Sequence, residues 1–163
     1  MRQASLCLFI KENGDDKEIL LAMKKRGFGK GRWNGVGGKP NLENGENVFD
    51  SAIRESFEEI GVNPESLEKF AVIDFYFPEE FKEKDFDQQV HVFLVKEWKG
   101  EPGETEEMMP KWFKIKEIPY NRMWDDDKYW LPYILKGKKL KAKFVFNKKD
   151  KIIEKNIEII EEI

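Results

Sequence analysis

The sequence contains only one cysteine and one histidine, and its charges nearly cancel. The single cysteine, Cys7, excludes an internal disulfide and is typical of a reducing compartment; its apolar surroundings predict a buried strand residue. A zinc site has no basis, because a second histidine and a cysteine pair are both missing. The net charge of −3 argues against broad binding of nucleic acid polymers, which requires a basic surface.

Long apolar runs are missing as well. No run approaches the roughly 20 residues of a transmembrane helix, and the chain begins with a strand pattern rather than a signal peptide. We therefore expect a cytoplasmic protein without a membrane partner, while a mitochondrial or nuclear pool stays open. A length of 163 residues favours one domain over residues 1–163, and we expect a monomer.

Alternating apolar residues and turn residues predict strands on both sides of one long helix. The expected strands are Ala4–Ile10, Glu18–Lys24, Phe70–Phe77, Val90–Lys96, Lys111–Ile115, Lys141–Phe146 and Ile152–Ile160, the last of which also fits a helix. The expected helices are Glu46–Ile60 and Asp125–Leu135, and a polar loop is expected at Glu79–Asp87. This order predicts an α/β fold with helices on the faces of a mixed sheet.

The segment from Gly38 to Val62 ends in Arg-Glu-Ser-Phe-Glu-Glu-Ile-Gly-Val. Helical spacing places Glu55, Glu58 and Glu59 on one face. The apolar residues of the other side predict a core stripe of Phe49, Ala52, Ile53, Phe57 and Ile60. Clustered carboxylates repel one another, so a fold that gathers them favours a cation between them, and oxygen ligands favour Mg²⁺ or Mn²⁺. The plain alternative is a solvated, glutamate-rich helix face.

The flanks of this helix resemble the Nudix hydrolases, whose signature is Gly-x5-Glu-x7-Arg-Glu-U-x-Glu-Glu-x-Gly-U, with U a bulky apolar residue. Arg54 and the three glutamates match, Glu46 takes the first glutamate position, and Gly61 stands where a left-handed C-cap belongs. Two features depart from the pattern. Seven residues rather than five separate Gly38 from Glu46, and Ser56 replaces an apolar residue. We expect the Ser56 hydroxyl to bond a carbonyl one turn earlier.

The resemblance implies the Nudix α/β/α sandwich and a metal-dependent pyrophosphohydrolase. Such an enzyme directs water onto a phosphorus of a nucleoside triphosphate and releases the monophosphate and pyrophosphate. The implied metal ligands are the Gly38 carbonyl, Glu55, Glu58, Glu59 and Glu107. Arg54 is expected to orient the glutamates by bidentate pairing, and Glu59 is favoured as the base.

Segments outside the signature resemble the animal members of this family that act on oxidised purine nucleoside triphosphates. They are Met23–Lys39, His91–Phe93, Glu106–Phe113 and Ile118–Leu135. This resemblance implies hydrolysis of 8-oxo-dGTP and 2-hydroxy-dATP, with O6-methyl-dGTP as a further candidate, which sanitises the nucleotide pool. The alternatives are a Nudix hydrolase for a dinucleoside polyphosphate, a nucleotide sugar or capped RNA, and a non-catalytic Nudix-fold binding module.

A purine base needs an aromatic face to stack on and polar groups along its edge. The residues that match pocket positions of these enzymes are Ser5, Lys24, Phe28, Asn34, Phe75, Phe77, Met108, Trp124, Asp126 and Asp127. Two adjacent carboxylates in a partly apolar pocket raise the pKa of one of them, so Asp126 and Asp127 are expected to share a proton. The protonated carboxyl donates to O6 of a guanine, and the ionised one accepts from N1–H or N2–H.

Several of these residues also have a structural interpretation. Asp125–Asp127 precede a predicted helix, and at least one of them is expected to cap it. The lysine-rich stretch Lys136–Lys155 is typical of an exposed or edge strand, with a nucleic-acid patch as the alternative. His91 is typical of a structural histidine within a strand, with a catalytic histidine as the alternative. Trp124, taken alone, is more often a core residue than a ligand platform.

Overall fold

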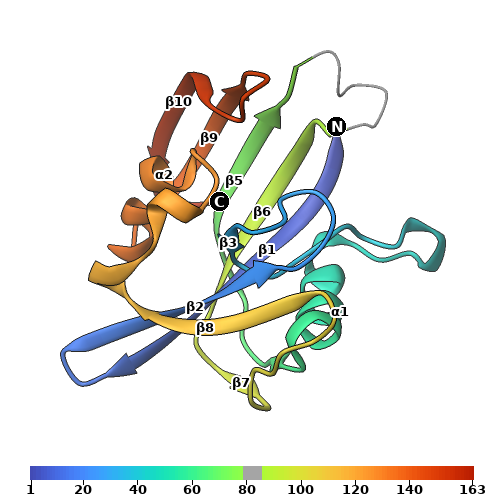
Figure 1. Ribbon diagram of the computed structural model, residues 1–163, viewed down its shortest axis with the longest axis vertical. Helices are drawn as coiled ribbons and strands as arrows, with labels where there is room; N and C mark the ends of the chain where they lie inside the picture. Colours follow the sequence, from blue (N-terminus) through green and yellow to red (C-terminus); the bar gives the residue numbers. More distant parts are fainter. Residues whose placement is uncertain (79–85) are drawn as a thin grey trace.

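The computed structural model describes residues 1–78 and 86–163 (Figure 1). Its strands are β1 (Arg2–Asn13), β2 (Asp16–Lys24), β3 (Trp33–Asn34), β4 (Asn63–Pro64), β5 (Glu68–Tyr76), β6 (Gln88–Val95), β7 (Trp98–Lys99), β8 (Met108–Lys114), β9 (Lys139–Phe146) and β10 (Ile152–Ile160). Its helices are α1 (Val48–Ile60), α2 (Asp127–Leu135) and the short 3₁₀ turns η1 (Leu42–Asn44), η3 (Ile115–Glu117) and η4 (Tyr120–Arg122). No helix within the described ranges is long and apolar enough to cross a membrane. Most of the loop predicted over Glu79–Asp87 lies outside the described residues.

The large sheet is mixed, as predicted. Its eight strands follow the order β10-β9-β5-β6-β1-β2-β3, with β8 paired to β2. β1 runs parallel to β6, and β5 runs parallel to β9, whereas the other neighbouring pairs are antiparallel. β4 and β7 form a separate two-stranded ribbon.

Both faces of this sheet are buried, and the alternation within β1 shows why. Leu8 belongs to a core cluster that includes Trp130 of α2, whereas its neighbour Cys7 belongs to a second cluster that includes Ala52 of α1. Successive side chains of a strand point to opposite faces, so one helix covers each face (Figure 1). This arrangement confirms the predicted α/β/α sandwich.

The C-terminal segment forms a strand rather than the alternative helix. β10 lies at the edge of the sheet, whereas β9, the strand that lies wholly within the lysine-rich stretch, pairs with both β10 and β5. The edge position predicted for this stretch is therefore confirmed for β10 and wrong for β9. His91 lies within β6, and its Nε2 is 2.6 Å from Gln3 Oε1, as expected for a structural histidine. Both helices begin two residues later than predicted, α1 at Val48 and α2 at Asp127.

Candidate active site

Two caps determine where α1 begins and ends. The Asn47 side chain accepts from Asp50 N at 2.8 Å, and the Asp50 carboxylate accepts from Asn47 N at 3.3 Å, which completes a capping box. At the other end, Gly61 has a φ of 75°, the left-handed conformation predicted from the sequence. The first helical residue is therefore Val48, and the later start follows from the cap at Asn47.

The buried face of α1 differs from the predicted apolar stripe. Phe49 and Phe57 are 43% and 55% exposed, whereas Glu59 is only 6% exposed. The fully buried residues of the helix are Ser51, Ala52, Ser56 and Ile60. The prediction is wrong for the two phenylalanines because small side chains let the helix approach β1 closely, with Cys7 Sγ 3.8 Å from Ala52 O.

The buried hydroxyls of this face are hydrogen-bonded. Ser56 Oγ donates to Ala52 O at 2.7 Å, which confirms the predicted bond one turn earlier. Ser51 Oγ lies 3.2 Å from Ser5 Oγ, and Ser5 Oγ lies 3.2 Å from Gly38 O. These contacts join α1, β1 and the loop that precedes the helix.

Gly37 and Gly38 occupy positions where no side chain fits. A Cβ on Gly37 would lie 2.0 Å from Ser5 O, and a Cβ on Gly38 would lie 2.5 Å from Glu55 Cδ. Ser5 N donates to Gly38 O at 2.8 Å, so the loop backbone runs directly against β1. The two glycines therefore permit the close approach that brings this loop next to Glu55.

We expect Gly37→Ala to destabilise the fold by about 3 kcal/mol or more, because its methyl group overlaps a backbone oxygen of β1. In a chain of this size the change corresponds to a Tm lower by roughly 6–12 °C, measured by thermal unfolding. Gly103→Ala is the matched control, because no atom lies within 4 Å of its added Cβ. Equal Tm values for the two variants would contradict the close approach.

Arg54 joins this loop to the helix. Its bidentate pair is with Glu46, through Nε at 2.7 Å and one Nη at 3.0 Å, and it makes single bonds to Glu55 at 2.9 Å and Glu58 at 3.0 Å. The bond from Arg54 is the main cause of a lowered pKa at Glu46. The two extra residues before Glu46 therefore do not keep this glutamate from the arginine.

Glu59 is the most buried of the signature glutamates. Burial, and then the neighbouring Glu55 and Glu107, raise its pKa to about 8. Burial also raises the pKa of Glu55. In the described part of the chain, Glu59 Oε2 is buried without a hydrogen-bond partner. An unpaired carboxylate oxygen beside a second carboxylate fits a divalent cation that prefers oxygen ligands.

The other two predicted acidic ligands point to arginines. Glu58 bonds Arg54, and Glu107 lies 3.2 Å from Arg26. Within residues 1–78 and 86–163, no group of three acidic, histidine or cysteine side chains forms a metal-binding cluster. Glu59 Oε2 is thus available to a cation as it stands. Glu55 and Glu58 both bond Arg54, and Glu107 pairs with Arg26, so these three have to leave an arginine to join it.

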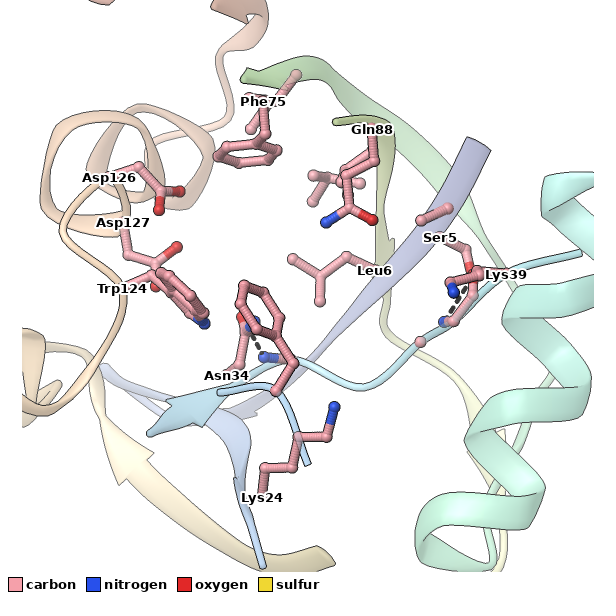
Figure 2. A pocket seen from close by; sticks show the side chains of 18 of the residues that line it. Ser5, Leu6, Lys24, Asn34, Lys39, Phe75, Gln88, Trp124, Asp126 and Asp127 are labelled. Atoms are coloured by element: carbon pink, nitrogen blue, oxygen red, sulfur yellow. Dashed lines mark hydrogen bonds between the residues drawn. The ribbon is translucent and has the colours of Figure 1, made fainter. Parts of the chain in front are cut away.

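A cavity of about 320 Å³ connects this region with α2. Glu59 and Gly38 line it, and so do Asp126 and Asp127. Figure 2 shows Trp124, Asp126 and Asp127 on one side of the cavity, with Ser5 and Lys39 on the other. Between these sides lie Asn34, Leu6, Phe75 and Gln88 (Figure 2). Polar groups therefore converge on a largely apolar space of the size that binds a small molecule.

The aspartate pair is deeply buried. Asp126 and Asp127 are each 3% exposed, and Asp126 Oδ2 accepts from Trp130 Nε1 at 2.7 Å. Asp127 Oδ2 is buried without a partner among the described residues. Burial raises the pKa of Asp126 to about 6, and burial together with Asp126 raises the pKa of Asp127 well above its ordinary value. Burial therefore favours a protonated carboxyl in this pair.

The expected capping role is wrong for these aspartates. Asp126 stands at the N-cap of α2 but has helical dihedral angles and no side-chain cap bond. Asp125 instead accepts from Ile152 N at 2.9 Å and pairs with Lys128 at 3.0 Å. The side chains are used in tertiary contacts, which outweigh the local preference for capping.

The raised pKa values predict that stability falls as pH rises. An unfolded aspartate titrates near about 3.9, so the folded pair binds a proton that the unfolded chain has already released. The stability that this proton adds to the folded state is fully present below pH about 4 and is lost as pH rises through about 6 and above. We expect the Tm of Asp127→Asn, measured by thermal unfolding, to fall less between pH 5 and pH 8 than the Tm of the wild type. Parallel Tm profiles would contradict the shared proton.

All ten predicted binding residues line the cavity: Ser5, Lys24, Phe28, Asn34, Phe75, Phe77, Met108, Trp124, Asp126 and Asp127. Of the predicted catalytic residues and metal ligands, Gly38 and Glu59 line it, and Arg54, Glu55, Glu58 and Glu107 lie outside it. Sequence reasoning missed Gln88, which points into the cavity from β6 (Figure 2). The period of two in this strand, with Val90 and Val92 on the same face, is the signal that identifies it.

Residues 1–134 match the NUDIX domain, and the chain belongs to the Nudix family. Members of this family generally use divalent metal ions. Two relatives carry the name "Oxidized purine nucleoside triphosphate hydrolase". The zebrafish (Danio rerio) protein is 41% identical over 145 residues, which cover 89% of each chain. The mouse (Mus musculus) protein is 43% identical over 137 residues, which cover 84% of each chain.

Solved structures share the fold. The MutT protein from Bacillus halodurans superimposes with a TM-score of 0.80 at 21% identity, covering 97% of this chain and 98% of its own. MutT from Aliivibrio salmonicida and Vibrio cholerae gives a TM-score of 0.61 at 20% identity, covering 83% of this chain and 96% of its own. At these identities the likeness concerns the fold alone.

Proposed function

We propose that the protein hydrolyses oxidised purine nucleoside triphosphates to the monophosphate and pyrophosphate, and so clears them from the cytoplasmic nucleotide pool. One observation carries the proposal. A single cavity is lined both by Glu59 of the signature helix and by the buried pair Asp126 and Asp127 beside Trp124. The first group suits phosphate chemistry and the second suits a purine. The activity named for the zebrafish and mouse relatives supports the same substrate class.

The phosphate half depends on the glutamates. The groups assigned to the divalent cation, Mg²⁺ or Mn²⁺, are Gly38 O, Glu55, Glu58, Glu59 and Glu107. When bound, the cation would neutralise the charge that develops on the phosphates and would lower the pKa of the attacking water. Glu59 is assigned as the group that accepts the proton of that water, because it is the signature glutamate that lines the cavity and its Oε2 has no partner among the described residues. Arg54 orients Glu55 and Glu58 through its hydrogen bonds.

The base half depends on the aspartate pair. Asp126 accepts from the indole N–H of Trp130, which favours its ionised form, so Asp127 holds the shared proton. The protonated carboxyl donates to O6 of an oxidised guanine, and the ionised one accepts from N1–H or N2–H. Moving the proton between the two admits a differently tautomerised purine such as 2-hydroxyadenine. Trp124 supplies the stacking face.

Asn34 completes the edge contacts. Its Oδ1 accepts from Gly35 N at 2.9 Å, so the fixed amide turns its NH₂ group to the substrate. A cavity of about 320 Å³ holds one nucleotide rather than a nucleic acid polymer.

Comparative kinetics with pyrophosphate detection test this function. We expect kcat/KM for 8-oxo-dGTP and 2-hydroxy-dATP to exceed that for dGTP by at least tenfold in the presence of Mg²⁺, with O6-methyl-dGTP as a third substrate. Equal values for dGTP and 8-oxo-dGTP would contradict a sanitising role. Preferential cleavage of a dinucleoside polyphosphate, nucleotide sugar or capped RNA would replace the proposed substrate class.

A further inference from the structure

The indole of Trp124 is covered by a charged side chain from a distant part of the chain. Arg32 Cζ lies 4.1 Å from the centre of the Trp124 ring, within the range of a cation–π contact. Aromatic rings approach the indole from other directions, with Phe28 at 5.0 Å and Phe146 at 5.5 Å between ring centres. The guanidinium is thus the one charged group recorded over this ring in the described residues.

Arg32 is itself held by an ion pair. Its Nη2 donates to Asp150 Oδ2 at 2.9 Å, and the two side chains are only 31% and 29% exposed. Arg32 precedes β3, whereas Asp150 lies in the turn between β9 and β10. Two loops that are distant in sequence therefore meet at the indole.

The turn that carries Asp150 has a defined shape. Asn147 Oδ1 accepts from Lys149 N at 2.9 Å and from Lys151 N at 3.0 Å. Asp150 adopts a φ of 58°, the only positive φ recorded at a non-glycine residue in the described chain. Aspartate tolerates this left-handed conformation and asparagine adopts it readily. The fold accepts an unfavourable backbone at the residue whose carboxylate reaches Arg32.

The same turn is tied to the residue after Trp124. Ile152 N donates to Asp125 Oδ2 at 2.9 Å. The backbone next to Trp124 is therefore fixed by β10, and the ring of Trp124 is fixed by Arg32. Together these contacts determine both where the indole lies and how it is tilted.

We propose that Arg32 and Asp150 are positioning residues that set the plane of the Trp124 indole for stacking with the substrate base. This inference rests on the proposed function, because it takes Trp124 as the stacking face. Arg32 occupies one side of the ring, which leaves the cavity side for the base. An indole already held in place loses less freedom when the base binds, and this lowers KM. The chemistry at the glutamates is unaffected.

Fluorine NMR of protein labelled with 5-fluorotryptophan tests the contact without any substrate. The chain has five tryptophans, and the Trp124 resonance is assigned with Trp124→Phe. We expect Arg32→Gln and Asp150→Asn to shift or broaden the Trp124 line, with Arg32→Lys restoring part of the wild-type position. Asp150→Asn preserves the turn, because asparagine adopts the same backbone conformation.

Lys11→Gln is the matched control. Lys11 Nζ lies 4.3 Å from the centre of the Trp112 ring and pairs with Glu18 at 3.5 Å, which reproduces a cation over an indole outside the cavity. This variant should move the Trp112 line and leave the Trp124 line in place. An unchanged Trp124 line in Arg32→Gln overturns the proposal, whatever the enzyme's substrate.

Steady-state kinetics on 8-oxo-dGTP test the consequence. We expect each of Arg32→Gln and Asp150→Asn to raise KM about fivefold with kcat within twofold of wild type, and the double variant to be no worse than the poorer single one. Unchanged KM values, or additive effects, overturn the positioning role. A wild-type enzyme that does not cleave 8-oxo-dGTP contradicts the proposed function instead, and the NMR result then decides the inference alone.

Discussion

Glu59→Gln should lower kcat by about 10³-fold, on the order of the loss seen when one electrostatic group is removed from an active site. Glu59 is the signature glutamate that lines the cavity, and its Oε2 has no partner among the described residues. Glutamine keeps the shape of the side chain but removes its negative charge and its ability to take a proton. Both the proposed binding of the cation and the activation of water therefore fail together.

The measurement is steady-state pyrophosphate release at increasing Mg²⁺, with Tm recorded to show that the fold is intact. Tm should rise or stay level, because the substitution removes a buried carboxylate whose pKa is raised by burial. Glu43→Gln, on the exposed η1 turn, is the control and should keep wild-type kcat. Turnover of Glu59→Gln within tenfold of wild type would contradict the role of Glu59.

Glu58→Gln tests whether Glu58 is one of the metal ligands. Glu58 is bonded to Arg54 in the structure and has to reorient before it can bind a cation. Wild-type turnover in Glu58→Gln with Mg²⁺ would remove Glu58 from the assigned ligands. It would leave Gly38 O, Glu55, Glu59 and Glu107 as the assigned ligands.

The signature helix shows how far sequence reasoning reaches. The cap at Gly61 and the bond of Ser56 to Ala52 are local features, set by residues within one or two turns, and both were predictable. The burial of Glu59 and the exposure of Phe57 were not. They depend on how closely β1 approaches the helix, and hydrophobic periodicity carries no information about that distance.

The cavity shows the same difference between local contacts, which the sequence predicts, and contacts between distant segments, which it does not. The contact between Asp126 and Trp130 spans one helical turn and follows from the spacing of the two residues. The bond from Ile152 N to Asp125 spans 27 positions and depends on where β10 ends up in the sheet. The resemblance to known enzymes placed all ten binding residues around one cavity, but it gave no reason to single out Arg32 or Gln88.

Asp126→Asn and Asp127→Asn should each lower kcat/KM by about 10²-fold on 8-oxo-dGTP or 2-hydroxy-dATP. A buried hydrogen bond to a charged group contributes about 1.5–3 kcal/mol, and an unmatched donor or acceptor adds to the loss. Both side chains are buried, and a base bound against them would keep water from replacing the missing partner. The two substitutions should not be equivalent, because Asp126 already accepts from Trp130 whereas Asp127 Oδ2 has no partner in the described chain.

The ratio of activities on the two substrates is the informative quantity. With two carboxyl groups, one proton moves to suit either purine; with one asparagine, donor and acceptor are fixed, so one substrate should lose more than the other. Asp74→Asn is the control, because Asp74 accepts from Gln89 at 2.9 Å and lies on β5 between Ile73 and Phe75, which line the cavity. Full activity of both variants on both substrates would show that the shared proton plays no part in base recognition. An equal loss on both would retain the contact and reject the proton shift.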